Sequence, residues 1–149
     1  MAAPESRMAK CVFCEIVAGR LPSHRVLDDP EFLGFLDERP VFKGHVLVVP
    51  RIHCDNLLDL PASLHAGILG RAQRLARALG PALGAEGTFV ALNDRVSQSV
   101  PHLHLHVIPR RKKDGLRGFF WPRMKYESDD ERAEIAARIA VAYAETSEN

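Results

Sequence analysis

Three histidines alternate with apolar residues in one short segment of the chain. Residues 101–109 read Pro-His-Leu-His-Leu-His-Val-Ile-Pro. Because side chains alternate between the two faces of a β-strand, the pattern predicts a strand with His102, His104 and His106 on one face and a leucine-rich core face behind them. Imidazole changes charge near neutral pH and serves as nucleophile, proton donor or metal ligand. The row therefore predicts a chemical site and leaves nucleophilic catalysis and a catalytic zinc both open.

A pair of cysteines forms a second candidate site. Cys11 and Cys14 are spaced as Cys-x-x-Cys, and the chain has three cysteines in all. A secreted disulfide scaffold needs more cysteines, and residues 1–10 have no apolar signal core, so we expect a cytoplasmic protein. In a reducing compartment the pair is interpreted as metal ligands, as a redox pair or as two reduced core thiols.

The composition is that of one globular domain. The 149 residues are 46% hydrophobic and 26% charged, with a formal net charge of +1. No run approaches the roughly 18 apolar residues of a membrane-spanning helix, and a near-neutral chain gives no electrostatic reason to expect nucleic-acid or membrane partners. The glycine-rich phosphate loops of kinase-like and dinucleotide-binding folds are also absent from the sequence.

The elements that must position the histidines follow an α+β pattern. The long helix is predicted from leucine, isoleucine and alanine residues that recur every three or four positions. It lies between strand pairs rather than after every strand, which favours a five-stranded, largely antiparallel sheet. The predicted elements are a short helix (15–18), strands at 25–28, 32–37, 44–49, 87–93 and 101–109, the long helix (61–83) and a C-terminal helix from Ser128.

The histidine segment fits the histidine-triad pattern, His-φ-His-φ-His-φ-φ with φ apolar, at every position. Further segments agree with that family in order and spacing: Cys11–Ile16, Phe35–Asp37, Gly44–His53, Asn93 and Gln98–Ser99. The chain thus resembles the histidine-triad family over roughly residues 10–110. The resemblance implies a flexible tail (1–9) before one domain (10–149), in which 10–110 form the triad core and 111–149 add a loop and the last helix. It also implies a homodimer with a continuous ten-stranded sheet.

The resemblance implies a nucleotide hydrolase acting at the α-phosphate of adenosine phosphoramidates, dinucleoside polyphosphates or related adenylates. By position, His104 is the nucleophile that forms a nucleotidyl-histidine before water releases AMP. The family uses no catalytic metal, so donors already in place, His106 and Ser99, would meet the phosphoryl charge. The implied nucleotide contacts are Asp37 to the ribose, Phe13, Ile16, Phe35 and Leu36 around the base, and Asn93, Gln98 and Ser99 at the phosphates.

Some family members add two histidines to a Cys-x-x-Cys pair and bind a structural zinc. His53 and His102 match those ligands here, beside Cys11 and Cys14. Two thiolates and two imidazoles suit a closed tetrahedral zinc site. His102 would then hold the metal while His104 reacts.

Three segments depart from the family pattern or lie beyond it. The loop 93–98 is shorter than in many members and has no glycine, which bears on its phosphate contacts; Arg95 is a candidate replacement cation. The basic segment 110–118 is either a solvated loop or a collar for distal phosphates. The aromatic residues 119–121 would cover the core, meet a dimer partner or wall the pocket.

Two other functions remain open on the sequence alone. One is a zinc-dependent hydrolase that uses His102, His104 and His106 as metal ligands. The other is a nucleotide-binding or scaffold protein with little turnover.

Overall fold

A computed structural model describes residues 11–116 and 123–147 of the chain. The expected tail, residues 1–9, and the aromatic residues 119–121 lie outside the described residues. The chain divides into two units, Met1–Lys112 and Lys113–Asn149, which are described here one at a time. Within the described residues, no helix is long and apolar enough to cross a membrane.

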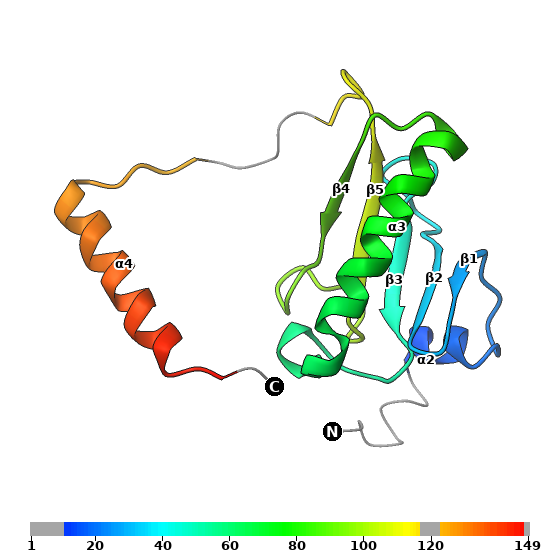
Figure 1. The fold of residues 1–149 in the computed structure, drawn as a ribbon, viewed down its shortest axis with the longest axis horizontal. Coiled ribbons are helices and arrows are strands. Elements are labelled where there is room, and N and C mark those ends of the chain that lie inside the picture. The colour runs from blue at the N-terminus through cyan, green and yellow to red at the C-terminus, as the bar shows by residue number, and fades with distance from the viewer. Residues whose placement is uncertain (1–10, 117–122, 148–149) are drawn as a thin grey trace. The chain divides into compact units, whose positions relative to one another are not determined.

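The first unit is built on one antiparallel sheet of five strands in the order β1-β2-β3-β5-β4 (Figure 1). The strands are β1 (Arg25–Asp28), β2 (Phe32–Leu36), β3 (Val46–Pro50), β4 (Gly87–Ala91) and β5 (Leu105–Arg110). The predicted five-stranded antiparallel sheet is therefore confirmed, as is the hairpin formed by β1 and β2. In β3 and β5, Leu47 lies opposite His106 and Val46 lies opposite Val107.

The histidine strand begins later than the sequence predicts. β5 starts at Leu105 instead of Pro101, because residues 101–104 leave the ladder and Leu103 donates its N–H to the carbonyl of Cys54 (2.8 Å). His102 and His104 therefore stand on the approach to the strand. This approach is as well buried as the strand itself, since His102 and Leu103 are both 0% exposed.

The long helix α3 (His65–Leu83) covers one face of the sheet, over β5 and β3 (Figure 1). Two short 3-10 turns, Leu57–Asp59 and Ala62–Leu64, precede it. The predicted helix is confirmed in type, and it ends at Gly84, whose φ of +70° gives the left-handed cap that favours glycine. Its apolar side joins the sheet in one core cluster, which includes Phe32, Val46, Val48, Ile68, Ala72, Leu79, Leu103, Leu105 and Val107.

The opposite face of the sheet carries a second core cluster and the short helix α2 (Val12–Val17). Leu47 and Val49 belong to this cluster, whereas their neighbours Val46 and Val48 belong to the first, as the alternation of strand side chains requires. The remaining members are Cys11, Phe13, Cys14, Leu33 and Phe35. This second face carries the candidate site.

The second unit contains the helix α4 (Asp129–Ala144). Ser128 caps its first turn by accepting a hydrogen bond from the N–H of Glu131 (3.0 Å), so the predicted start of the C-terminal helix is confirmed.

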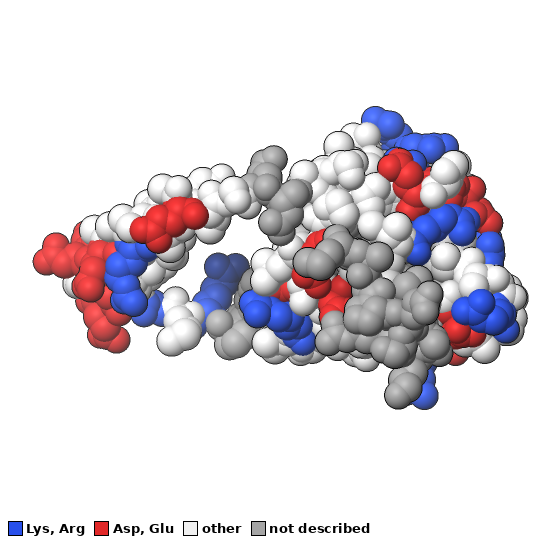
Figure 2. Space-filling view, turned by 90° about the horizontal axis from the view of Figure 1, so that it is seen from below, with Lys and Arg blue, Asp and Glu red and all other residues white. Residues whose placement is uncertain are grey.

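On the face of the molecule seen in Figure 2, Lys and Arg side chains are interspersed with Asp and Glu, in keeping with the net charge of +1.

Candidate active site and metal centre

His104 is held in one tautomer by the backbone. Its Nδ1 lies 2.9 Å from the carbonyl oxygen of His102. Because a carbonyl only accepts, Nδ1 must carry the ring proton and Nε2 must present a lone pair. The ring is 5% exposed and meets Phe13 edge-on, with centroids 5.1 Å apart. An imidazole held by Nδ1, with the lone pair of its neutral form on Nε2, has the form that a histidine nucleophile requires.

A chain of hydrogen bonds fixes the tautomer of the third histidine of the row. The N–H of Val41 donates to Nδ1 of His45 (3.1 Å), so Nε2 of His45 carries the proton. That Nε2 lies 2.9 Å from Nδ1 of His106 and donates to it. The proton of neutral His106 is therefore on Nε2. Its ring centroid is 5.1 Å from that of His104, so the expected nucleophile and a hydrogen-bond donor stand side by side.

Burial keeps the hydrogen-bonded rings of His45 and His106 uncharged. It lowers the pKa of His106 to about 4, and the neighbouring rings of His104 and His45 act in the same direction. Burial also lowers the pKa of His45, although the nearby carboxylate of Asp37 opposes the shift. Both rings are thus neutral at pH 7, as the hydrogen-bond directions require.

Asp37 lies beside these histidines through main-chain contacts. Its N–H donates to the carbonyl of His45 (2.9 Å), and its Oδ1 accepts from the N–H of Arg39 (2.9 Å). The other carboxylate oxygen is 3.7 Å from Nε2 of His45, and 23% of the Asp37 side chain is exposed. The structure therefore brings the expected ribose ligand to the edge of the triad with surface left for a ligand.

The residues expected around the base divide into two pairs. Phe13 and Phe35 are buried and pack edge to face, with centroids 5.5 Å apart. Ile16 is half-buried and Leu36 is 37% exposed. The aromatic pair thus belongs to the core beneath the site, while the two aliphatic side chains keep accessible apolar surface.

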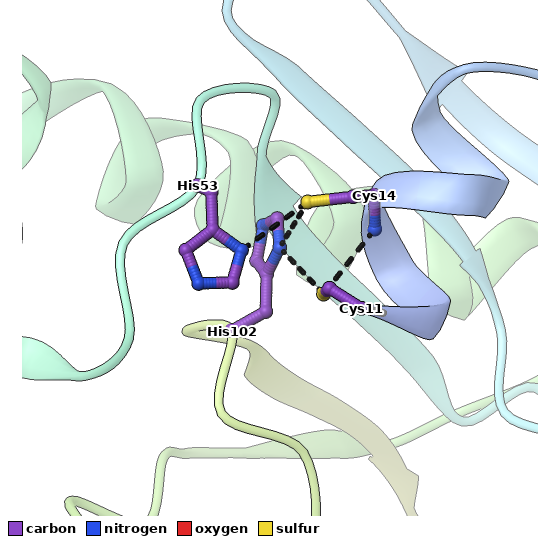
Figure 3. Close-up of side chains that lie close together, drawn as sticks. All are labelled: Cys11, Cys14, His53 and His102. Carbon is purple, nitrogen blue, oxygen red and sulfur yellow. Dashed lines mark hydrogen bonds between the residues drawn. The ribbon is translucent and has the colours of Figure 1, made fainter. Parts of the chain in front are cut away.

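The four expected metal ligands meet in one buried cluster (Figure 3). Their ligand atoms all lie within 4.8 Å of one another. Nδ1 of His102 is 3.4 Å from Sγ of Cys11, and Nδ1 of His53 is 3.2 Å from Sγ of Cys14. Ligands of a tetrahedral zinc, with bonds of about 2.0 to 2.3 Å, stand about 3.5 Å apart, so the spacing fits this ion.

The surroundings of the cluster also fit a cation. Nε2 of His53 donates to the carboxylate of Asp55 (2.7 Å), and Nε2 of His102 donates to the carbonyl of Pro50 (2.9 Å). These contacts turn both Nδ1 lone pairs toward the sulfurs, as outer contacts of zinc-binding histidines do. Burial raises the pKa of the Cys14 thiol to about 12, so thiolates in this position need a positive charge beside them.

The three histidines of the row do not converge on a single metal. Among the described residues, the groups that could hold an ion are Cys11, Cys14, His53 and His102, and separately Asp37, His45 and His106. Nδ1 of His104 is engaged by a backbone carbonyl. The geometry therefore divides the row between a metal centre and a reactive pair.

Comparison with known proteins gives the family of the chain. The HIT domain matches residues 18–113 of the chain. The chain belongs to the HIT (histidine-triad) family.

Three HIT proteins illustrate the likeness. A HIT-like protein of Mycobacterium tuberculosis is 38% identical over 134 residues, covering 89% of this chain and 93% of its own. An adenosine 5'-monophosphoramidase of Saccharomyces cerevisiae is 33% identical over 133 residues, covering 87% and 80%. The crystal structure of a zinc-bound histidine-triad family protein from Mycobacterium smegmatis matches with a TM-score of 0.71 and 40% identity, covering 93% and 99%.

The loop before the triad of this HIT chain is held by its own side chains. The amide nitrogen of Gln98 donates to the carbonyls of Asp55 and Val100, and its oxygen accepts from the N–H of Arg95 (2.9 Å). Asn93 donates to a carbonyl within the loop (3.2 Å). A phosphate contact by Gln98 would therefore require it to exchange one of these bonds. Ser99, which follows it, is exposed.

The charged residues near the expected phosphate end also have local contacts. Nε of Arg95 lies 3.6 Å from the carboxylate of Asp94. The guanidinium of Arg111 bonds the carbonyls of Leu83 and Gly84 at the end of α3, where a cation is favoured by the helix dipole. This part of the basic segment thus stabilises the helix end.

Sequence reasoning missed two residues of this site. The sequence shows no partner for His45, yet this residue links the main chain at Val41 to His106. Asp55 was not singled out, yet its carboxylate contacts the expected metal ligand His53 and its carbonyl accepts from Gln98. The signal available for His45 was its place at the head of the predicted central strand, next to the histidine strand; Asp55 follows His53 by two residues and gave none.

Proposed function

We propose that the protein is a nucleotide hydrolase that cleaves adenosine phosphoramidates, dinucleoside polyphosphates or related adenylates at the α-phosphate and releases AMP. The observation that carries the proposal is the bond between Nδ1 of His104 and the carbonyl of His102, which leaves Nε2 as the free base. The yeast relative named as an adenosine 5'-monophosphoramidase supports this substrate class.

The reaction proceeds in two displacements. Nε2 of His104 attacks the α-phosphorus in line with the leaving group, the P–N or P–O bond to that group breaks, and a nucleotidyl-histidine forms. Water then attacks the same phosphorus, releases AMP and returns His104 to its neutral form. The Nε2–H of His106 donates to a phosphoryl oxygen while negative charge develops there.

The other nucleotide contacts come from residues around this pair. The carboxylate of Asp37 accepts from the ribose hydroxyls, and Ile16 and Leu36 offer apolar surface to the base above Phe13 and Phe35. The hydroxyl of Ser99 stands at the end of the loop that leads to the triad and contacts the phosphate or the leaving group.

The metal centre in this proposal holds a structural zinc on Cys11, Cys14, His53 and His102. Its contribution is a cross-link that ties the start of α2 to the segments after β3 and before β5. It takes no part in either displacement.

The decisive experiment is product analysis by chromatography. The purified protein is incubated with adenosine 5'-phosphoramidate and, separately, with diadenosine tetraphosphate, beside His104→Ala and the matched surface variant His24→Ala. We expect AMP release by the wild type and by His24→Ala, and a loss of at least a thousandfold in His104→Ala. AMP release by His104→Ala at more than a tenth of the wild-type rate refutes the nucleophile assignment.

Two further arms test the alternatives. AMP release that stops on mild chelation, while the circular dichroism spectrum is unchanged, would replace the nucleophile with a catalytic zinc. Nucleotide binding without turnover of either substrate would leave a binding or scaffold protein.

We also propose a homodimer. Among the described strands β4 lies at one edge of the sheet, next to β5, and an edge strand is where a second copy can continue a sheet. Light scattering after size-exclusion chromatography gives the mass, and a monomer at micromolar concentration refutes the assignment.

A further inference from the structure

We infer that Cys11 and Cys14 form an oxidation-sensitive site that controls hydrolysis from outside the reactive pair. The inference rests on the proposed zinc centre and on the proposed hydrolysis at His104. Its basis is that each histidine of the metal cluster is bonded to a different part of the catalytic apparatus.

The first connection runs through His102. Its imidazole faces the sulfurs of Cys11 and Cys14 at 3.4 and 3.5 Å, and its Nε2 is anchored to the carbonyl of Pro50. The backbone carbonyl of the same residue accepts the proton of His104 Nδ1 (2.9 Å). A metal bond that holds the His102 side chain therefore also holds the acceptor that selects the reactive tautomer of His104.

The second connection runs through His53. Its Nε2 donates to the side chain of Asp55 (2.7 Å), and the backbone carbonyl of Asp55 accepts from the amide of Gln98. The same amide accepts the N–H of Arg95 and donates to Val100. The loop that leads to Ser99 and the triad is thus fastened to the outer contact of a metal ligand.

The two connections reach the reactive pair by separate routes. One comes from the residue two positions before His104, and the other comes from the loop before Pro101. Release of the metal would loosen the nucleophile and the expected phosphate loop together.

The thiol pair supplies the chemistry that releases the metal. Cys11 and Cys14 are two residues apart at the start of α2, where the N–H of Cys14 donates to Sγ of Cys11 (3.4 Å). Their sulfurs lie within 4.8 Å of each other, so side-chain rotation brings them to the roughly 2.05 Å of a disulfide. A disulfide sulfur is a poor zinc ligand, since the thiolate is the form that binds.

The balanced step uses a peroxide as the oxidant. Two thiolates give up two electrons and form the S–S bond; the O–O bond of hydrogen peroxide breaks, takes up those electrons and two protons, and yields two water molecules. The zinc ion leaves because only two imidazoles remain to hold it. A dithiol reductant with added zinc reverses the step.

The third cysteine provides a control within the same chain. Cys54 belongs to the core cluster on the α3 face of the sheet. Cys54→Ser removes a buried thiol without touching the metal cluster.

The experiment titrates the zinc-loaded full-length protein with hydrogen peroxide. Four quantities are followed on the same samples: zinc released to a colorimetric chelator, the Cys11–Cys14 disulfide by mass spectrometry, AMP release, and the His104 Nδ1–H signal by ¹⁵N NMR. We expect one zinc ion and two thiols to be lost together, AMP release to fall at least tenfold, and the His104 signal to broaden or shift. Reductant plus zinc restores all four, and Cys54→Ser behaves as the wild type.

Several outcomes overturn the inference. These are a disulfide with released zinc but unchanged AMP release and an unchanged His104 signal, a loss of activity that reductant and zinc do not restore, and protection by Cys54→Ser. A purified protein that hydrolyses substrate without zinc removes the zinc assignment and the inference but leaves the hydrolase standing. A zinc-loaded protein without turnover refutes the proposed function instead, and the NMR signal still reports the coupling.

Discussion

Replacing His45 separates its two hydrogen bonds, one to the main chain and one to the reactive pair. Its Nδ1 accepts from the N–H of Val41 and its Nε2 donates to His106. The amide oxygen of His45→Asn can still accept near the position of Nδ1, but this shorter side chain loses the donor to His106. The longer side chain of His45→Gln instead carries an amide donor out to the position of Nε2. The two variants are therefore matched in chemistry and differ in which bond survives.

The expected magnitudes follow from the two bonds. A neutral hydrogen bond contributes about 1 kcal/mol net, and the loss of one preorganised donor to a transition-state oxyanion costs about a hundredfold to a thousandfold in rate. His45→Asn leaves His106 in place without its orienting contact, so we expect kcat to fall about 10- to 100-fold with a small change in KM. We expect His45→Gln to stay within about fivefold of the wild type and to lose about 1 to 2 kcal/mol of unfolding free energy.

The assay is steady-state AMP release by each variant, with urea unfolding as the stability control. An Asn variant within threefold of the wild-type kcat would refute the reasoning, since His106 would then need no contact from His45. An Asn variant that is slower only because it is partly unfolded is identified by the urea midpoint.

Three further predictions concern stability. Gly44 has a φ of +100°, and a Cβ there would overlap a leucine of α3, so we expect Gly44→Ala to lower the free energy of urea unfolding by about 3 kcal/mol. Gly70, in the same helix, has open space where a Cβ would lie, so we expect Gly70→Ala to raise this free energy by about 0.5 to 1 kcal/mol. Equal effects of the two substitutions would refute this. An arginine of α3 lowers the pKa of Asp29 to about 2, so its contribution is present above pH 4 and is lost as the pH falls toward 2; Asp29→Asn should cost about 1 kcal/mol at pH 7 and flatten that part of the unfolding profile. The pKa of His106 is lowered to about 4, so the unfolded chain binds its proton first and the unfolding free energy should fall between pH 6.5 and 4 by up to about 1.4 kcal/mol per pH unit, a slope that His106→Asn should reduce.

Much of the fold could be predicted because its signals are local. The alternation in residues 101–109 and the periodicity of 61–83 gave the types of β5 and α3. The position where β5 begins could not be read in this way. It depends on a main-chain hydrogen bond from Leu103 to Cys54, which are 49 positions apart, and periodicity carries no information on such a contact.

The candidate site shows the same difference. The four expected metal ligands came from the Cys-x-x-Cys spacing and from the resemblance to the family, and all four lie in one cluster. The bond between His45 and His106 joins residues 61 positions apart, and it depends on which ring nitrogen faces which neighbour. Residue type leaves that orientation open, so the positioning role of His45 emerges only from the folded chain.

The pairing of β3 with β5 makes the two faces of the sheet depend on its register. Leu47 lies opposite His106, so His106 of β5 shares the face of Leu47, while Leu105 and Val107 belong to the core cluster on the α3 side. Because strand side chains repeat every two residues, a slip of one position exchanges the two faces. A slip of β5 by one position against β3 would turn imidazoles toward Ile68 and Ala72 on the α3 side and valine toward the opposite side, with the composition unchanged. A slip of two positions would keep each set of side chains on its own face.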